Sequence, residues 1–92
     1  MILIKNSIGY SINNENEHAI LNGRVFFENS VMTINLLAYS KNGDYIGACS
    51  YNYININDCT KVISRVPKSY ISIIEKMLDE IVEFLIEKFN IK

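Results

Sequence analysis

Residues 31–54 read VMTINLLAYSKNGDYIGACSYNYI, and this stretch decides the fold. It places Asn42-Gly43 between two apolar runs. This dipeptide is the strongest short-range signal for a β-hairpin, because the tight turn needs positive φ at both central residues. With Asn42 and Gly43 at the centre of the turn, Leu36 lies opposite Cys49. The stretch therefore predicts two antiparallel strands whose register follows from the turn.

The same register predicts which side chains share a face, because side chains alternate along a strand. Ser40 is expected opposite Tyr45, close to the turn. A second turn at 28–30 adds a third strand, and the facing is the same whichever two residues form its centre. Residues 18–57 are thus predicted to form a meander with one apolar face. We expect this face to comprise Leu21, Gly23, Val25, Phe27, Met32, Ile34, Leu36, Ala38, Gly47, Cys49, Tyr51 and Tyr53.

The opposite face of the meander is predicted to be mixed. Polar residues hold its middle, and apolar residues cluster toward the Asn-Gly turn. These apolar residues, called the sheet patch below, are Ile20, Leu37, Tyr39 and Ile46. A sheet face that is open to solvent usually carries more charge than this one. We therefore expect a binding partner to cover part of it.

The segments on either side of the meander are less regular. Residues 2–4 and 8–12 are each expected to form a short edge strand, and residues 13–17 form a polar loop. Residues 59–66 fit either a fourth strand or a short helical turn capped by Asp58. Pro67 disfavours a helix before it and suits the first turn of one that follows it. We predict a helix over residues 67–90.

The predicted helix has an apolar band that is wider than one sheet requires. Ile73, Phe84 and Ile91 widen this band to about half of the circumference, whereas a stripe of about 100° is enough to cover a sheet. We therefore predict a homodimer or helix–helix contact through Ile73, Met77, Phe84 and Ile91. The alternative is that the N-terminal strands cover this margin of the helix.

Together these elements predict an α+β fold: an antiparallel β-meander of three to five strands packed against one long C-terminal α-helix. We expect residues 1–92 to form a single domain. A hydrophobic content of 49% and a charged content of 21% are typical of globular proteins and unlike disordered or collagen-like chains. A domain this small often gains stability by pairing with a partner.

Composition also excludes several classes of function and location. The net charge is −1, whereas general binding to nucleic acid or to anionic membranes needs a basic surplus. The two cysteines form no CxxC pair and indicate a reducing environment. The short apolar start at 1–5 fits neither a signal peptide nor a membrane span. We expect a cytoplasmic protein that is not bound to a membrane.

Patterns for catalysis and metal binding are missing as well. One His and two separated Cys match no zinc pattern. His18 with Cys59 is the only conceivable Cys–His pair, because Cys49 lies on the predicted core face, and the register does not bring the pair together. The glycines form no phosphate-binding loop. We expect no enzyme activity, no catalytic residue, no metal and no cofactor.

Two charged clusters are candidate binding sites. The outward side of the predicted helix carries an acidic ridge, which consists of Glu75, Asp79, Glu80, Glu83 and Glu87. This ridge is either a solvated helix face or a surface that docks on a basic partner. A basic cluster, which consists of Lys61, Arg65 and Lys68, supports an alternative role in binding RNA or single-stranded DNA.

The chain is similar in kind to the small accessory proteins of phages and mobile elements. It holds 16 Ile and 12 Asn, a bias that indicates an AT-rich coding sequence. Inhibitors of bacterial defence systems, including anti-CRISPR proteins, are one such group. We therefore predict a small non-enzymatic module that docks on a larger protein, with a homodimer expected. The other alternative is a structural or antitoxin-like subunit that associates with itself.

Overall fold

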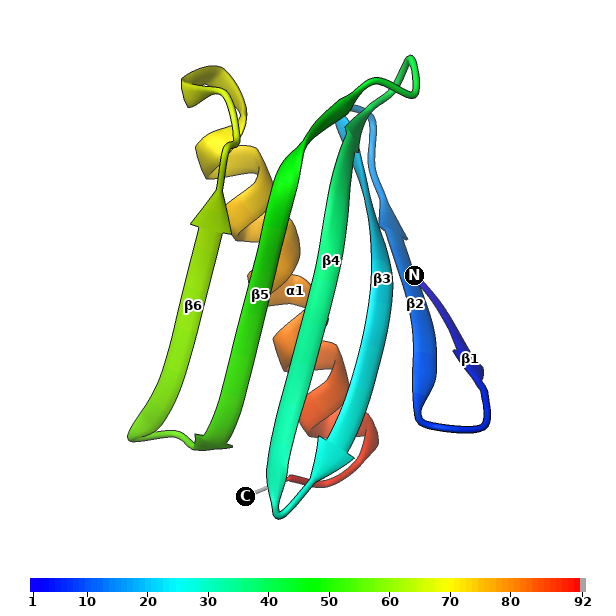
Figure 1. Ribbon diagram of the computed structural model, residues 1–92, viewed down its shortest axis with the longest axis vertical. Helices are drawn as coiled ribbons and strands as arrows, with labels where there is room; N and C mark the ends of the chain where they lie inside the picture. Colours follow the sequence, from blue (N-terminus) through cyan, green and yellow to red (C-terminus); the bar gives the residue numbers. More distant parts are fainter. Residues whose placement is uncertain (92) are drawn as a thin grey trace.

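A computed structural model describes residues 1–91 and shows one sheet with one long helix on one of its faces (Figure 1). The sheet has six antiparallel strands in sequence order. They are β1 (Ile2–Lys5), β2 (Tyr10–Glu15), β3 (Ala19–Glu28), β4 (Val31–Ser40), β5 (Tyr45–Asn55) and β6 (Asp58–Ser64). The helix α1 (Ile71–Lys88) follows a 3₁₀ turn, η1 (Lys68–Tyr70). The predicted α+β class, a meander with one C-terminal helix, is confirmed.

The number of strands is six, so our prediction of three to five was too low. The polar segment expected as a loop at 13–17 is a strand as far as Glu15, and it pairs with residues 20–22 of β3. The buried amide of Asn14 donates a hydrogen bond to the carbonyl oxygen of Met77 at 3.2 Å. This bond satisfies a polar side chain inside the core. At the other edge, residues 58–64 form a strand, so the strand alternative for 59–66 is correct.

The hairpin between β4 and β5 follows the predicted register except at its tip. Leu36 pairs with Cys49 as expected, but Tyr39, rather than Ser40, pairs with Tyr45. The Ser40 amide donates to the carbonyl oxygen of Asp44 at 2.8 Å, which closes a loop one residue longer than a two-residue turn. The pairing shifts by one residue at a β-bulge between Ala38 and Tyr39. From Ala38 onward, away from the turn, the hairpin follows the predicted register.

The turn between β3 and β4 is a tight two-residue turn. Glu28 pairs with Val31, so Asn29 and Ser30 form its centre. Both residues have positive φ, 51° and 66°, as a hairpin turn of this length requires. This turn sets the facing of β3 against β4, and Leu21 and Val25 are buried as predicted, whereas Phe27, near the end of β3, is 45% exposed.

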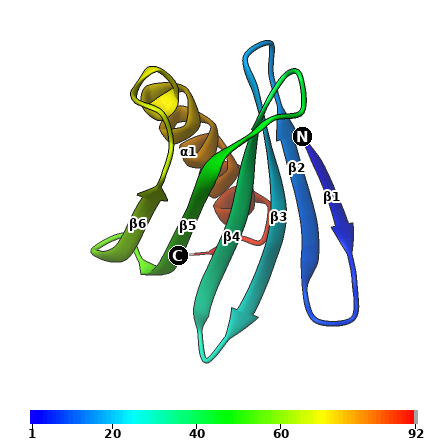
Figure 2. The same ribbon diagram turned by 45° about the horizontal axis from the view of Figure 1, so that its top comes forward.

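The helix predicted over 67–90 is shorter in the structure, where residues 68–70 form the 3₁₀ turn and α1 spans Ile71–Lys88. Asn90 has a φ of 51°, and the Ile91 amide donates to the Ile86 carbonyl oxygen at 2.9 Å, which together terminate α1 in a Schellman motif. The helix crosses the inner face obliquely, from the β6 side, where it begins, to β3, where it ends (Figures 1 and 2). The buried apolar core comprises Ile12, Ala19, Leu21, Val25, Met32, Ile34, Leu36, Ala38, Cys49, Tyr53, Ile74, Met77, Leu78, Ile81, Val82 and Leu85.

Candidate binding surface

The outer face of the sheet, opposite α1, is open across its centre. Cross-strand pairing aligns Ser11, Arg24, Asn35, Ser50 and Val62 in one row that runs from β2 to β6. These positions lie on the outer face because side chains alternate along each strand, and the neighbouring Ile12, Val25, Ile34 and Cys49 are buried in the core. A single layer of helix therefore leaves a wide surface of the sheet in contact with solvent.

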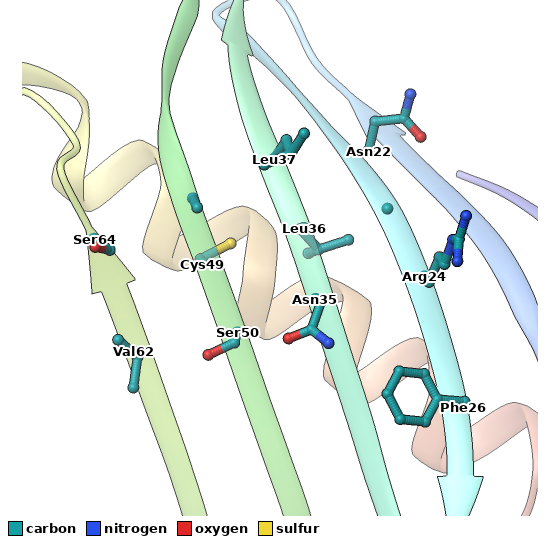
Figure 3. Close-up of a pocket in the computed structure, with 12 residues that line it drawn as sticks. Asn22, Arg24, Phe26, Asn35, Leu36, Leu37, Cys49, Ser50, Val62 and Ser64 are labelled. Carbon is teal, nitrogen blue, oxygen red and sulfur yellow. The ribbon is translucent and has the colours of Figure 1, made fainter.

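A shallow hollow of about 490 Å³ occupies the middle of this outer face. In Figure 3 the other labelled side chains lie on the outer face, with the helix behind the sheet, whereas Leu36 and Cys49 belong to the buried core. The hollow is lined by Asn22, Gly23, Arg24, Phe26, Asn35, Leu36, Leu37, Ala48, Cys49, Ser50, Val62 and Ser64. Arg24 is the single charged residue in this lining. The hollow thus combines amides, hydroxyls and apolar side chains around one guanidinium group.

The structure assembles most of the sheet patch but replaces one member. Ile20 pairs with Tyr39, and Leu37 is 45% exposed on the same face. Ile46, however, lies at the bulge and packs against the core. Tyr45 takes its place on the outer face, with its ring centroid 6.0 Å from that of Tyr39. The assignment of Ile46 was wrong because the extra loop residue shifted the tip of the hairpin by one position.

The acidic ridge lies on the solvent side of α1, but β6 partly neutralises it. The Lys61 ammonium lies 3.1 Å from a carboxylate oxygen of Asp79 and 4.0 Å from one of Glu75. Glu80, Glu83 and Glu87 are exposed and take part in none of the ion pairs within residues 1–91. Only the C-terminal part of the ridge is therefore free to attract a basic partner.

The basic cluster is divided by the same ion pairs. Lys61 pairs with Tyr51 on the inner face of the sheet and points toward α1. Arg65 and Lys68 are exposed in the segment between β6 and α1. A nucleic-acid site that uses all three residues would have to compete with Asp79 for Lys61, which weakens the support for this alternative.

The predicted dimer contact is split between the core and the surface. Met77 has an exposed fraction of 0%, so it offers no surface to a second chain. Ile73, Phe84 and Ile91 are half-buried against the core. Strand β2 covers part of this margin through Asn14, which contacts the backbone of Met77. This contact agrees with the alternative that the N-terminal strands cover part of the margin, and a dimer contact through Ile73, Phe84 and Ile91 stays a prediction.

The two thiols lie in different environments and are not brought together with His18. Cys49 is buried on β5, and burial raises the pKa of its thiol to about 11. Cys59 is exposed on β6, and its hydrogen bond with Tyr51 is the largest cause that raises the pKa of that phenol to about 12. His18 lies in the turn between β2 and β3, 3.3 Å from a carboxylate oxygen of Glu17.

Within residues 1–91, no group of three His, Cys, Asp or Glu side chains has a geometry that would hold a metal ion. In the same part of the chain, no helix is both long and apolar enough to cross a membrane.

Comparisons with protein-family models, with curated proteins and with solved structures found no match to this chain. The candidate surface therefore has to be interpreted from its own geometry. Asn22, Arg24, Phe26, Asn35 and Ser50 alternate with predicted core residues, so the predicted register already puts them on the outer face, but no sequence pattern selects them as a site. The hollow itself is lined by residues of β3, β4, β5 and β6, which only the folded sheet brings together.

Proposed function

We propose that this protein is a small non-enzymatic protein-binding module that docks on a larger protein through the outer face of its sheet. The observation that carries the proposal is the composition of this face. Its centre is open and holds amides, hydroxyls and apolar side chains with Arg24 as the single charge in the hollow. A face whose centre carries a single charge is easier to desolvate than the usual, more highly charged sheet surface.

The size of the face suits a protein partner. The molecule measures 35 × 27 × 18 Å, and Figure 1, viewed down the shortest axis, shows the sheet across the two longer dimensions. A stable protein–protein interface buries about 800 Å² on each partner. The outer face is large enough to supply this area. The hollow is shallow and open, so it suits a protein surface better than a small molecule, which is usually enclosed by its pocket.

The class of partner that we propose is a larger protein of a bacterial defence system, bound in the manner of an anti-CRISPR inhibitor. This choice is supported by the small size of the chain and by its bias toward Ile and Asn, which indicates an AT-rich coding sequence. Blocking a larger protein requires only a stable interface, so this function needs no catalytic group.

The experiment is a pull-down. It compares the partner protein captured by the tagged wild type with that captured by each of two tagged variants. Leu37→Asp places a charge on the outer face at a side chain that is 45% exposed, and Glu83→Gln is a matched control on the exposed face of α1. We expect the wild type and Glu83→Gln to retain one dominant protein and Leu37→Asp to lose it. Hydrogen exchange on the purified complex should then show protection of β3, β4 and β5.

Equal capture by Leu37→Asp and the wild type, or the recovery of no specific protein, would contradict the proposal. If Glu83→Gln alone failed to capture the partner, the interface would lie on the acidic ridge instead of the outer face. Circular dichroism of both variants verifies that each remains folded.

A further inference from the structure

We infer that the hollow on the outer face is a carboxylate-binding site, in which Arg24 receives an Asp or Glu side chain of the partner protein. This inference rests on the proposed function, because it names the chemistry of the group that the outer face accepts. It starts from Arg24, which takes part in none of the ion pairs within residues 1–91.

The neighbours of Arg24 are known from the strand register. Ser11 and Asn35 lie directly across from it on β2 and β4. Asn22 and Phe26 lie on the same face of β3, two positions away along the strand. None of these neighbours is acidic, and the ion pairs within residues 1–91 involve His18, Lys41 and Lys61 rather than Arg24. The guanidinium therefore has polar but uncharged surroundings.

These surroundings fit a carboxylate. A guanidinium group binds the two oxygens of a carboxylate through parallel hydrogen bonds. The Asn22 and Asn35 amides and the Ser50 hydroxyl line the same hollow and supply further donors at its floor. Phe26, Leu37 and Val62 surround these groups (Figure 3). Covering the hollow with a partner would exclude water there, and a charged hydrogen bond is stronger in such an environment.

The charge distribution favours a protein carboxylate over a nucleic-acid phosphate. Arg24 is the one cation in the hollow, the net charge of the chain is −1, and α1 carries the acidic ridge. Nucleic-acid binding gains its affinity from several phosphate contacts, which this face does not offer. A partner surface that presents one carboxylate beside apolar groups matches this face, which presents one guanidinium together with Phe26 and Leu37.

The test is an NMR titration of the ¹⁵N-labelled full chain with N-acetyl-aspartate amide. N-acetyl-asparagine amide serves as the neutral probe of equal size, and inorganic phosphate as the other anion. We expect the aspartate probe to give saturable shifts of the backbone amides around Arg24 and Asn35 and the neutral probe to give none. Phosphate should bind at least tenfold more weakly than aspartate.

The chain offers a matched pair of variants, because Arg24 and Arg65 are its two arginines. Arg24→Gln should abolish the aspartate-dependent shifts, whereas Arg65→Gln, which removes the exposed arginine after β6, should leave them unchanged. Arg24→Lys should weaken binding, because an ammonium cannot form the bidentate contact.

Three results would overturn the inference: the absence of saturable shifts, equal shifts in Arg24→Gln, or tighter binding of phosphate than of aspartate. The partner-capture experiment separates this failure from that of the proposed function. Suppose that Leu37→Asp loses the partner, but Arg24→Gln retains it and gives the same aspartate titration as the wild type. The outer face then still binds protein, and only the carboxylate site is wrong. If Leu37→Asp retains the partner, the proposed function itself fails.

Discussion

The two cysteines show how strongly the position of a residue in the sheet controls its chemistry. Cys49 lies in the core with an exposed fraction of 4%, and burial raises the pKa of its thiol to about 11. Cys59 is exposed on the edge strand β6. The thiolate is the reactive form of cysteine, so burial and the raised pKa should both keep the Cys49 thiol unreactive at pH 8.

We expect a disulfide reagent such as Ellman's reagent to label Cys59 alone in the native protein at pH 8. Cys49 should react only after a denaturant is added, because unfolding removes the burial that raises the pKa of its thiol. Cys59→Ser should abolish the native reaction and leave the denatured one. Rapid native labelling of two thiols in the wild type would show that Cys49 is accessible.

Ser30 is strained in the turn between β3 and β4. Its φ of 66° is unfavourable for a residue with a Cβ atom but not for glycine. We expect Ser30→Gly to raise the free energy of unfolding by about 1 kcal/mol. Ser69→Gly is the matched control, because Ser69 lies in the 3₁₀ turn before α1 and is not among the positive-φ residues. It should lower stability by about 0.5–1 kcal/mol, as measured by urea unfolding.

At the scale of single elements, β6 combines an open edge with an inward-pointing charge. Every residue of this strand except Ile63 is exposed, and the edge leaves backbone groups unpaired. Lys61 lies on its inner side, held by Asp79 and Glu75 of α1. Inward-pointing charges on edge strands oppose pairing with other chains. The residue that we assigned to a basic cluster therefore joins β6 to α1 in this fold.

The strength of this link can be measured with a double-mutant cycle of Lys61→Met and Asp79→Asn. The Lys61 and Asp79 side chains are 32% and 49% exposed, so we expect a coupling energy of about 0.2–1 kcal/mol at low salt. It should decrease in 1 M salt, because exposed charges are screened. A coupling that is zero at low salt would show that the ion pair does not form in solution.

The whole molecule places its one helix against a sheet that is wider than the sequence pattern indicated. Met77 is fully buried, whereas Phe84 is half-buried at the margin of the same helix. The two residues belonged to one predicted dimer contact, and the structure now separates their roles. Met77 contributes to the core of each chain, and only Ile73, Phe84 and Ile91 retain surface that a second copy can contact.

We expect Met77→Glu to destabilise the fold by about 4 kcal/mol or more, because it buries a carboxylate in the core. Phe84→Glu should cost about 2 kcal/mol and leave the chain folded. Circular dichroism measures the fold, and size-exclusion chromatography with light scattering measures the oligomeric state. A folded Phe84→Glu monomer from a dimeric wild type would support a dimer through this margin, and an unchanged dimer would contradict it. A folded Met77→Glu variant would contradict its burial in the core.

Much of the fold followed from local features of the sequence. The turn at 29–30, the turn that contains Gly43 and the alternation of apolar residues set the register of β3, β4 and β5 everywhere except at the tip of the second hairpin, because turns and alternation are properties of adjacent residues. The helix over 71–88 followed from its apolar period and from Pro67 before it. The open outer face was also visible in this register.

Only the tertiary structure decided the features that depend on residues far apart in the chain. Asn14 pairs with Leu21 in the sheet, and its buried side-chain amide is satisfied by the backbone of Met77, 63 positions later. Lys61 is neutralised because α1 returns beneath β6, 18 positions later. The hollow that Arg24 lines exists because β3, β4, β5 and β6 lie side by side in one sheet. No local pattern reports these contacts, since their free energy depends on groups that meet only when the whole chain has folded.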